Sequence, residues 1–266
     1  MPPLSLAALT ILDAGPAGQI RAAAAAGWKS VGLRLNPLLE SDIRVVGDRA
    51  REAEVEALMA QSGMKLLEIG VFPVTPDMDV AGLAPLLAFC GKLGARFLVC
   101  PVEDGDLPRR RETFARLCDL AAKYRLDALA EFNPYSGCKN LDAAVALVES
   151  VQRSNAGLVI DALHLSRSGG HPRDLLKVDP ELLRLLHFCD ATAFTAGETC
   201  IDDLRRESRT ARLLPGEGAL WLRELLQALP GETPISLEAP GAAYAGLPAS
   251  ERARIALEKT RTFLRG

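Results

Sequence analysis

Four residues of this 266-residue sequence combine a metal-binding type of side chain with a similar place in the chain: Glu131, Asp161, His187 and Glu238. Each lies at or near the end of a short apolar run, as in GLVID (157–161). Three carboxylates and one imidazole suit Mn²⁺, Mg²⁺ or Co²⁺, and they are also compatible with Zn²⁺. Any one of them alone would more often be a helix cap, a loop residue or a core histidine. Together they predict one metal site, because burying four such groups without a cation is costly.

The segments that must position these residues alternate between short apolar runs and longer stretches of helical character. Short continuous apolar runs are typical of strands buried on both faces of a parallel sheet. The eight predicted strands are 4–11, 30–35, 65–72, 96–102, 126–132, 157–161, 183–191 and 234–239. The segments between them place apolar residues at the i, i+3 and i+4 spacing of amphipathic helices. The predicted helices are 17–27, 51–63, 83–94, 111–124, 141–152 and 220–229.

Eight strand–helix units predict one α/β domain over residues 1–266, a single (β/α)₈ TIM barrel. A doubly wound open sheet is the structural alternative. No GxGxxG sequence follows the first strand, however, and no Walker A motif occurs, so the usual nucleotide-binding signatures are missing. In a TIM barrel the functional groups gather at the C-terminal ends of the strands, where the four metal-binding candidates are expected to meet.

Composition excludes several classes of partner. The 31 basic and 34 acidic residues give a formal net charge of −3, and no basic block or basic–aromatic pattern favours nucleic acid. No apolar run approaches the roughly 20 residues of a membrane-spanning helix, and the N-terminus lacks the basic region of a signal peptide. Six scattered cysteines without a CxxC pair favour reduced thiols in the cytoplasm. The composition is compatible with a homo-oligomer.

The sequence resembles the xylose isomerase-like TIM barrels, a family of sugar phosphate isomerases and epimerases. This family includes ketose 3-epimerases, inosose dehydratases and 3-dehydroshikimate dehydratases. The similarity runs from AAAAAGWKSVGLRL (22–35) to ISLEAP (235–240). The motifs that carry it are Glu131, the D-x-x-H of Asp161–His164, the H-x-x-D of His187–Asp190, RLLPGEG (212–218) and Glu238.

The resemblance implies that the four residues named first hold one divalent metal ion and that Glu131 and Glu238 also form an acid/base pair. It implies that His164 donates a hydrogen bond to a substrate oxygen and that Arg212 contacts substrate. The implied activity is a metal-dependent isomerase or epimerase of a sugar or sugar-like hydroxy-ketone, working through an enediolate. The alternative is a metal-dependent dehydratase of a cyclic polyol ketone or a dehydroshikimate-like acid, and the sequence does not choose between them.

Two further classes of protein fit the sequence less well. A nuclease of the endonuclease IV type shares this barrel but needs a histidine-rich trinuclear zinc site, whereas the chain has three histidines. Its acidic balance also lacks the positive surface that DNA binding requires. A non-catalytic sugar-binding barrel is the other alternative, and an intact ligand set argues against it.

The second predicted strand, SVGLRL, carries Arg34 where many relatives have a carboxylate. Strict alternation places Gly32 and Arg34 on one face of that strand. If Arg34 faces the barrel mouth, it could bind an anionic part of a substrate. The preferred interpretation is a salt bridge to Glu68 on the neighbouring strand, although Glu68 could also reach the site mouth.

Three expectations concern the seventh strand and the segment after it. Asp190 competes with His187 as the ligand of its strand, or it serves as a supporting or substrate-binding group. Gly216 and Gly218 either shape a substrate loop or mark a plain helix entry. The charged segment 192–211 is long enough to form a lid over the site.

Overall fold

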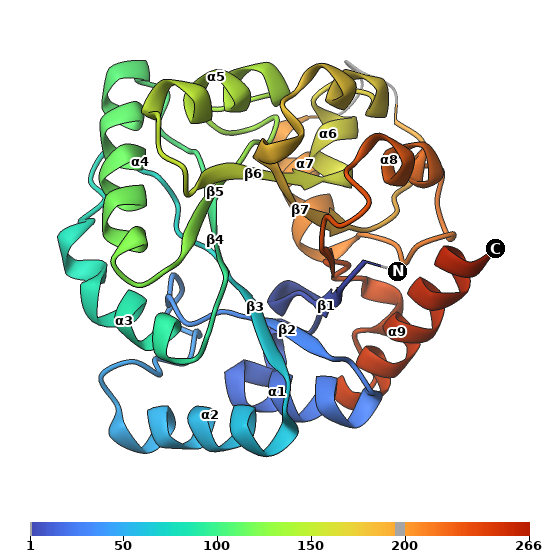
Figure 1. Cartoon of the computed structure of the whole chain (residues 1–266). Helices are drawn as coiled ribbons and strands as arrows, with labels where there is room; N and C mark the ends of the chain where they lie inside the picture. The colour runs from blue at the N-terminus through green and yellow to red at the C-terminus, as the bar shows by residue number, and fades with distance from the viewer. Residues whose placement is uncertain (1, 195–199) are drawn as a thin grey trace.

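The computed structural model describes residues 2–194 and 200–266, and in it eight parallel strands close into a barrel surrounded by helices (Figure 1). The strands pair in sequence order, and β1 also pairs with β8 to complete the ring. The predicted (β/α)₈ barrel is therefore confirmed. The strands are β1 (Leu4–Leu6), β2 (Ser30–Leu33), β3 (Lys65–Ile69), β4 (Phe97–Pro101), β5 (Asp127–Glu131), β6 (Ala156–Asp161), β7 (Leu183–Phe188) and β8 (Ile235–Leu237).

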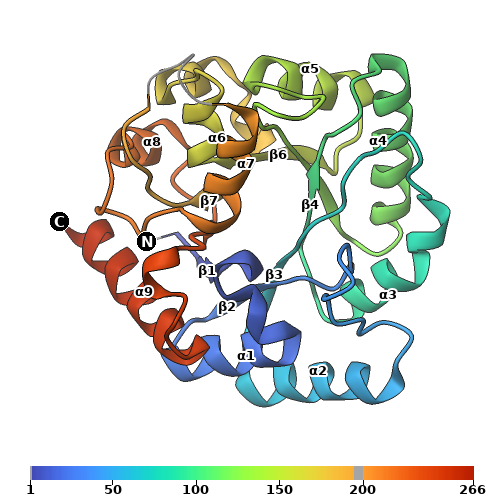
Figure 2. The same cartoon turned by 180° about the vertical axis from the view of Figure 1, so that it is seen from behind.

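Helices form a layer around the outside of the barrel, as Figure 2 shows from behind. The α-helices are α1 (Gly15–Ala26), α2 (Arg49–Ser62), α3 (Ala84–Lys92), α4 (Leu107–Ala122), α5 (Leu141–Val151), α6 (Ala162–Arg167), α7 (Ile201–Thr210), α8 (Leu222–Ala228) and α9 (Ala249–Arg265). Short 3₁₀ helices are η1 (Ala8–Ala14), η2 (Ala81–Leu83), η3 (Pro172–Lys177), η4 (Pro180–Leu182) and η5 (Ala242–Tyr244). The six predicted helices are present, and α6, α7 and α9 were not predicted.

Local sequence signals set several helix boundaries. Asp48 caps α2 by accepting hydrogen bonds from two backbone amides, and Asn140 caps α5 in the same way with one. At the other end, Gly27 follows α1 with a φ of 88°, in the left-handed region that glycine adopts without steric cost. Helix α9 closes the fold beside α1, where the Trp28 indole donates a hydrogen bond to the Ala253 carbonyl.

The barrel interior is filled by one cluster of inward-facing apolar side chains: Leu67, Phe97, Val99, Leu129, Val159 and Leu185. Side chains alternate between the two faces of a strand, so the residue two positions further along points the same way. Leu129, Val159 and Leu185 are therefore followed on the same face by the candidate ligands of β5, β6 and β7. The packed interior thus fixes the direction in which those ligands point.

No helix within the described part of the chain is long and apolar enough to cross a membrane. Five of the six cysteines are buried and unpaired, as expected for thiols used in packing, whereas Cys200 is exposed.

Candidate metal centre

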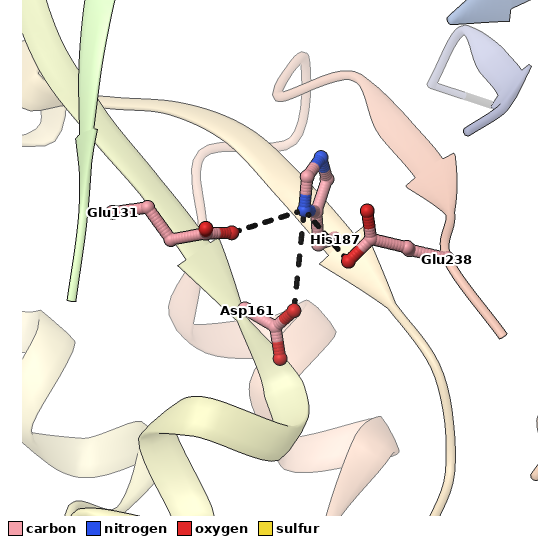
Figure 3. Close-up of side chains that lie close together, drawn as sticks. All are labelled: Glu131, Asp161, His187 and Glu238. Atoms are coloured by element: carbon pink, nitrogen blue, oxygen red, sulfur yellow. Dashed lines mark ion pairs between the residues drawn. The ribbon is translucent and has the colours of Figure 1, made fainter. Parts of the chain in front are cut away.

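The four candidate ligands come together at the C-terminal ends of the last four strands (Figure 3). One donor atom from each of them lies within 4.8 Å of the others. The His187 Nδ1 atom is 3.3 Å from both Glu131 Oε1 and Glu238 Oε2, and 3.9 Å from Asp161 Oδ2. All four side chains are buried. The structure therefore places three carboxylates around one imidazole nitrogen.

Strand ends and one helix cap hold these groups in place. Glu131 and Asp161 are the last residues of β5 and β6, and Glu238 directly follows β8. Asp161 is also the N-cap of α6, because its Oδ1 accepts a hydrogen bond of 2.9 Å from the His164 amide. That bond uses Oδ1, so Oδ2 is the Asp161 oxygen that faces His187.

The chemistry of the donor set fits a divalent cation. The Nδ1 atom of His187 is buried and has no hydrogen-bond partner among the described residues. A buried nitrogen without a partner is costly, and three carboxylate oxygens facing it provide the mixed oxygen and nitrogen set that divalent metals accept. Glu131, Asp161, His187 and Glu238 are the residues that would hold such an ion.

The pKa values in the cluster shift as its charges dictate. Burial alone would lower the pKa of His187, but the carboxylates of Glu238 and Glu68 outweigh it and hold that pKa well above its usual range. Burial would raise the pKa values of Asp161 and Glu238, but Arg212 and His187 outweigh it and hold both below their usual range. Asp161 and Glu238 are thus ionised near neutral pH.

Arg212 lies inside the cluster. Its Nη1 donates to Asp161 Oδ2 at 2.6 Å, and its Nη2 lies 3.1 Å from Glu238 Oε2. A third bond, from Nε to the Ser208 carbonyl, fixes the guanidinium, and the whole side chain is buried. This arginine therefore neutralises two of the candidate ligands directly.

Glu68 contacts the candidate ligand His187, a partner that the sequence did not predict for it. Its Oε2 lies 2.9 Å from His187 Nε2, and its Oε1 accepts a hydrogen bond of 2.5 Å from the Ser236 hydroxyl. The preferred interpretation of a salt bridge between Arg34 and Glu68 is wrong, because Glu68 turns into the barrel toward β7 and β8. A glutamate within the apolar run KLLEI was the only signal available in the sequence.

Arg34 instead faces the space above the cluster. Its Nη1 lies 3.9 Å from Asp42 Oδ2, which already accepts two backbone hydrogen bonds. Its Nε is buried and has no hydrogen-bond partner within residues 2–194 and 200–266. Arg34 lines a small cavity of about 20 Å³ together with Glu68, His187 and Glu238. It also lines a neighbouring cavity of about 600 Å³. Arg34 thus lies between the cluster and the larger cavity.

His164 packs beside the cluster. Its ring meets the Tyr135 ring edge-on, with centroids 5.8 Å apart, and the Tyr135 hydroxyl lies 2.8 Å from the Ser208 hydroxyl. Tyr135 was not singled out from the sequence. It connects the loop after β5 to α7 and supports the ring of His164.

Asp190 organises a loop and is not one of the four grouped donors. Its Oδ2 accepts hydrogen bonds of 3.0 Å from the amides of both Gly216 and Gly218, and its Oδ1 accepts a third from Leu220. A Cβ atom at Gly218 would stand 2.3 Å from the Ala191 carbonyl oxygen, so this position requires glycine. The PGEG motif is therefore a loop built on Asp190. Of the predicted lid 192–211, residues 195–199 lie outside the described part of the chain, and 201–210 form α7.

A model of the xylose isomerase-like TIM barrel family matches residues 20–263. An inosose isomerase from Halalkalibacterium halodurans is 31% identical over 115 residues, which cover 42% of this chain and 38% of that protein. An inosose isomerase from Bacillus licheniformis is 31% identical over 154 residues, covering 56% and 52% of the two chains. The matches thus span about half or less of the length of these relatives.

Solved structures share the fold. The IolI protein with a bound zinc atom superposes with a TM-score of 0.81 at 20% identity, covering 98% of this chain and 97% of that one. The D-allulose 3-epimerase from Methylomonas sp. in complex with D-allulose gives a TM-score of 0.70 at 16% identity, covering 98% and 96%. At these identities the likeness establishes the barrel fold.

Proposed function

This chain belongs to the xylose isomerase-like TIM barrel family, and on that premise we propose that it is a metal-dependent isomerase or epimerase of a sugar-like hydroxy-ketone. The observation that carries the proposal is the convergence of three buried carboxylates on Nδ1 of His187, which has no hydrogen-bond partner in the part of the chain that the structure describes. The relatives named inosose isomerase and the epimerase neighbour favour isomerisation over the dehydratase alternative.

One divalent cation would be held by Glu131, Asp161, His187 and Glu238. The buried cluster and the zinc-bound structural neighbour support this, and Mn²⁺, Mg²⁺, Co²⁺ and Zn²⁺ all suit the donor set. When bound, the ion supplies Lewis acidity that makes the proton next to the substrate carbonyl more acidic and stabilises the resulting enediolate.

Glu131 and Glu238 are the proposed acid/base pair. They extend from β5 and β8 and approach the His187 ring from opposite sides (Figure 3). One of the two, as a carboxylate, would remove the proton next to the carbonyl, and the other, in its protonated form, would donate a proton to the opposite face, which inverts the carbon. Proton exchange with solvent would then return both groups to their starting forms. Positioned acid/base groups of this kind contribute about 10²–10⁴-fold to the rate.

His164 and Arg212 are proposed to contact substrate oxygens. His164 lies beside the candidate ligands, and Arg212 places its positive charge directly against Asp161 and Glu238. Because the guanidinium already binds two ligands, Arg212 would also keep them oriented while substrate is present.

Arg34 is proposed to bind an anionic substituent of the substrate, since its guanidinium has a weak ion pair at 3.9 Å and lines the cavities next to His187 and Glu238. We expect Arg34→Gln to lower kcat/KM at least tenfold for substrates that carry a carboxylate or phosphate, because a charged hydrogen bond contributes about 1.5–3 kcal/mol. A neutral analogue of the same substrate serves as the control, and its kcat/KM should change little. Equal losses for both substrates would remove Arg34 from this role.

The proposed function is tested by incubating the purified, metal-loaded protein in D₂O with ketoses and inososes. Deuterium at the carbon next to the carbonyl, seen by NMR or mass spectrometry, is the expected result. Chelation of the metal should stop the exchange, and adding it back should restore it. A metal-loaded protein that exchanges no substrate of this class would contradict the proposal.

Metal binding is expected to release about one proton at neutral pH. The raised pKa of His187 keeps its imidazole protonated in the metal-free protein, whereas a ligating imidazole must be neutral. The apparent metal affinity should therefore rise as pH increases. Calorimetric titration of one metal ion in buffers of different ionisation enthalpy measures the number of protons released. An affinity that is constant between pH 6 and pH 8 would argue against His187 as a ligand.

A further inference from the structure

We infer that Glu68 is a positioning residue that fixes the His187 ring so that Nδ1, and not Nε2, faces the metal-binding carboxylates. The inference rests on the metal site of the proposed function, but it concerns metal affinity and ring orientation, so it can fail independently of the reaction.

The two nitrogens of His187 face different partners. Nδ1 faces the oxygens of Glu131, Asp161 and Glu238, whereas Nε2 lies 2.9 Å from Glu68 Oε2. Figure 3 shows the second ring nitrogen pointing away from the three carboxylates. A carboxylate that accepts the Nε2 proton leaves the Nδ1 lone pair for a cation.

Glu68 is itself held by a second hydrogen bond. Its Oε1 accepts from the Ser236 hydroxyl at 2.5 Å, and both side chains are almost completely buried. In the sheet register, Ser236 lies beside His187 on the neighbouring strand. The carboxylate of Glu68 therefore spans from β3 across the barrel to two adjacent strands, and it has little freedom to turn away.

An irregularity in β3 brings Glu68 into the barrel. Val31 of β2 pairs with Leu66, but the next residue, Gly32, pairs with Glu68, so Leu67 is an extra residue on β3. Leu67 belongs to the interior apolar cluster, and strict alternation would turn Glu68 to the outside. The bulge redirects it inward, as bulges near functional sites commonly do.

Gly32 provides the space that Glu68 needs. A Cβ atom at Gly32 would stand 2.7 Å from Glu68 Oε1 and 2.8 Å from its Cγ. Any larger residue there would push the carboxylate away from His187. Gly32, the bulge at Leu67 and Ser236 thus form one arrangement around Glu68. Burying an ionisable side chain in this way is costly unless its hydrogen bonds are satisfied.

The test measures zinc and cobalt affinity by competition with a chelator for the wild type and for Glu68→Leu, Glu68→Gln and Gly32→Ala. We expect Glu68→Leu to lose about 10–100-fold in affinity, the range typical for removing a group that orients a ligand. Glu68→Gln, whose amide oxygen can still accept the Nε2 proton, should lose less. Gly32→Ala should also lose affinity, although every ionisable group is retained.

A matched control is Asp104→Asn. Asp104 is as buried as Glu68 but pairs with Arg109 outside the barrel interior, so its loss should leave metal affinity unchanged. NMR of the zinc-loaded protein with ¹⁵N-labelled histidine reports which His187 nitrogen binds zinc. We expect Nδ1 in the wild type, with an Nε2 proton that exchanges slowly, and faster exchange or a switched nitrogen in Glu68→Leu.

The outcomes separate the two proposals. A wild type that binds neither zinc nor cobalt overturns the metal site, and the inference with it. A wild type that binds metal, with folded Glu68→Leu showing equal affinity and the same histidine spectrum, overturns the inference alone. If Glu68→Leu does not fold, Glu68→Gln and Gly32→Ala decide the matter, and unchanged affinity in both contradicts the role of Glu68.

Discussion

Replacing Glu238 with glutamine is expected to lower turnover by about 10²–10⁴-fold while leaving the fold intact. Glutamine has nearly the same shape but cannot exchange a proton at neutral pH. Glu238 also faces His187 Nδ1 at 3.3 Å, so the variant should bind metal more weakly. Turnover must therefore be measured with metal at saturation and with metal content checked by elemental analysis.

Glu131→Gln is the matched variant, because Glu131 lies at the same distance from His187 Nδ1 and approaches from the other side. If each glutamate serves one face of the substrate, each variant should lose deuterium exchange from a different epimer. Glu238→Gln with normal turnover would remove that residue from acid/base chemistry. Loss of exchange from the same epimer in both variants would contradict a two-base mechanism.

Replacing Arg212 with methionine is expected to destabilise the metal-free protein by about 3–5 kcal/mol at neutral pH. Methionine retains apolar volume but leaves Asp161 Oδ2 without its bond of 2.6 Å and Glu238 Oε2 without its partner at 3.1 Å. Removing one member of a buried ion pair costs this much because an uncompensated charge remains. Urea denaturation of the chelator-treated protein measures the loss.

The Arg212 effect should depend on pH and on metal. The pKa of Asp161 is held below its usual range, so the stability that this pairing contributes is present above the unfolded pKa of about 4. It is lost as pH falls through the folded pKa. The difference in free energy of unfolding between wild type and variant should therefore become smaller in acid. Added metal should also reduce this difference in free energy, because a bound dication replaces the missing positive charge.

Arg153→Met is the control for Arg212. Arg153 also lies 2.6 Å from a carboxylate, that of Asp119, but both side chains are largely exposed. Solvent screens such surface pairs, so Arg153→Met should lose much less free energy of unfolding than Arg212→Met. Comparable losses of stability in the two variants would contradict a strong buried ion pair between Arg212 and the two carboxylates. A loss at Arg212 that neither acid nor metal changes would contradict it as well.

The barrel and the four candidate ligands could be predicted because both depend on local pattern. Eight apolar runs separated by amphipathic segments leave few arrangements other than a closed parallel sheet. Within each strand, residues two positions apart point to the same face. A polar residue two positions after an apolar core residue therefore also points into the barrel, as His187 does after Leu185. The convergence of ligands then follows from the closure of the ring.

Other parts of the site could not be predicted, because they depend on contacts between distant strands. The alternation rule gave no reason to place Glu68 beside His187, 119 positions further along the chain. Only the extra residue at Leu67 reverses its direction, and a bulge of this kind has no distinct signal in KLLEI. The role of Asp190 likewise required the loop at Gly216 and Gly218 to fold back onto it.

The sequence by itself determined the class of fold, the strand ends at which chemistry can occur and the residue types found there, since these follow from the spacing of apolar and polar side chains along one strand. Tertiary structure alone decided which nitrogen of His187 faces the carboxylates, what Glu68 holds and where the Arg34 guanidinium lies. The reason is physical. A buried polar group is stable only in an orientation that satisfies its hydrogen bonds. The partners that satisfy them here come from strands that only the closed barrel brings together.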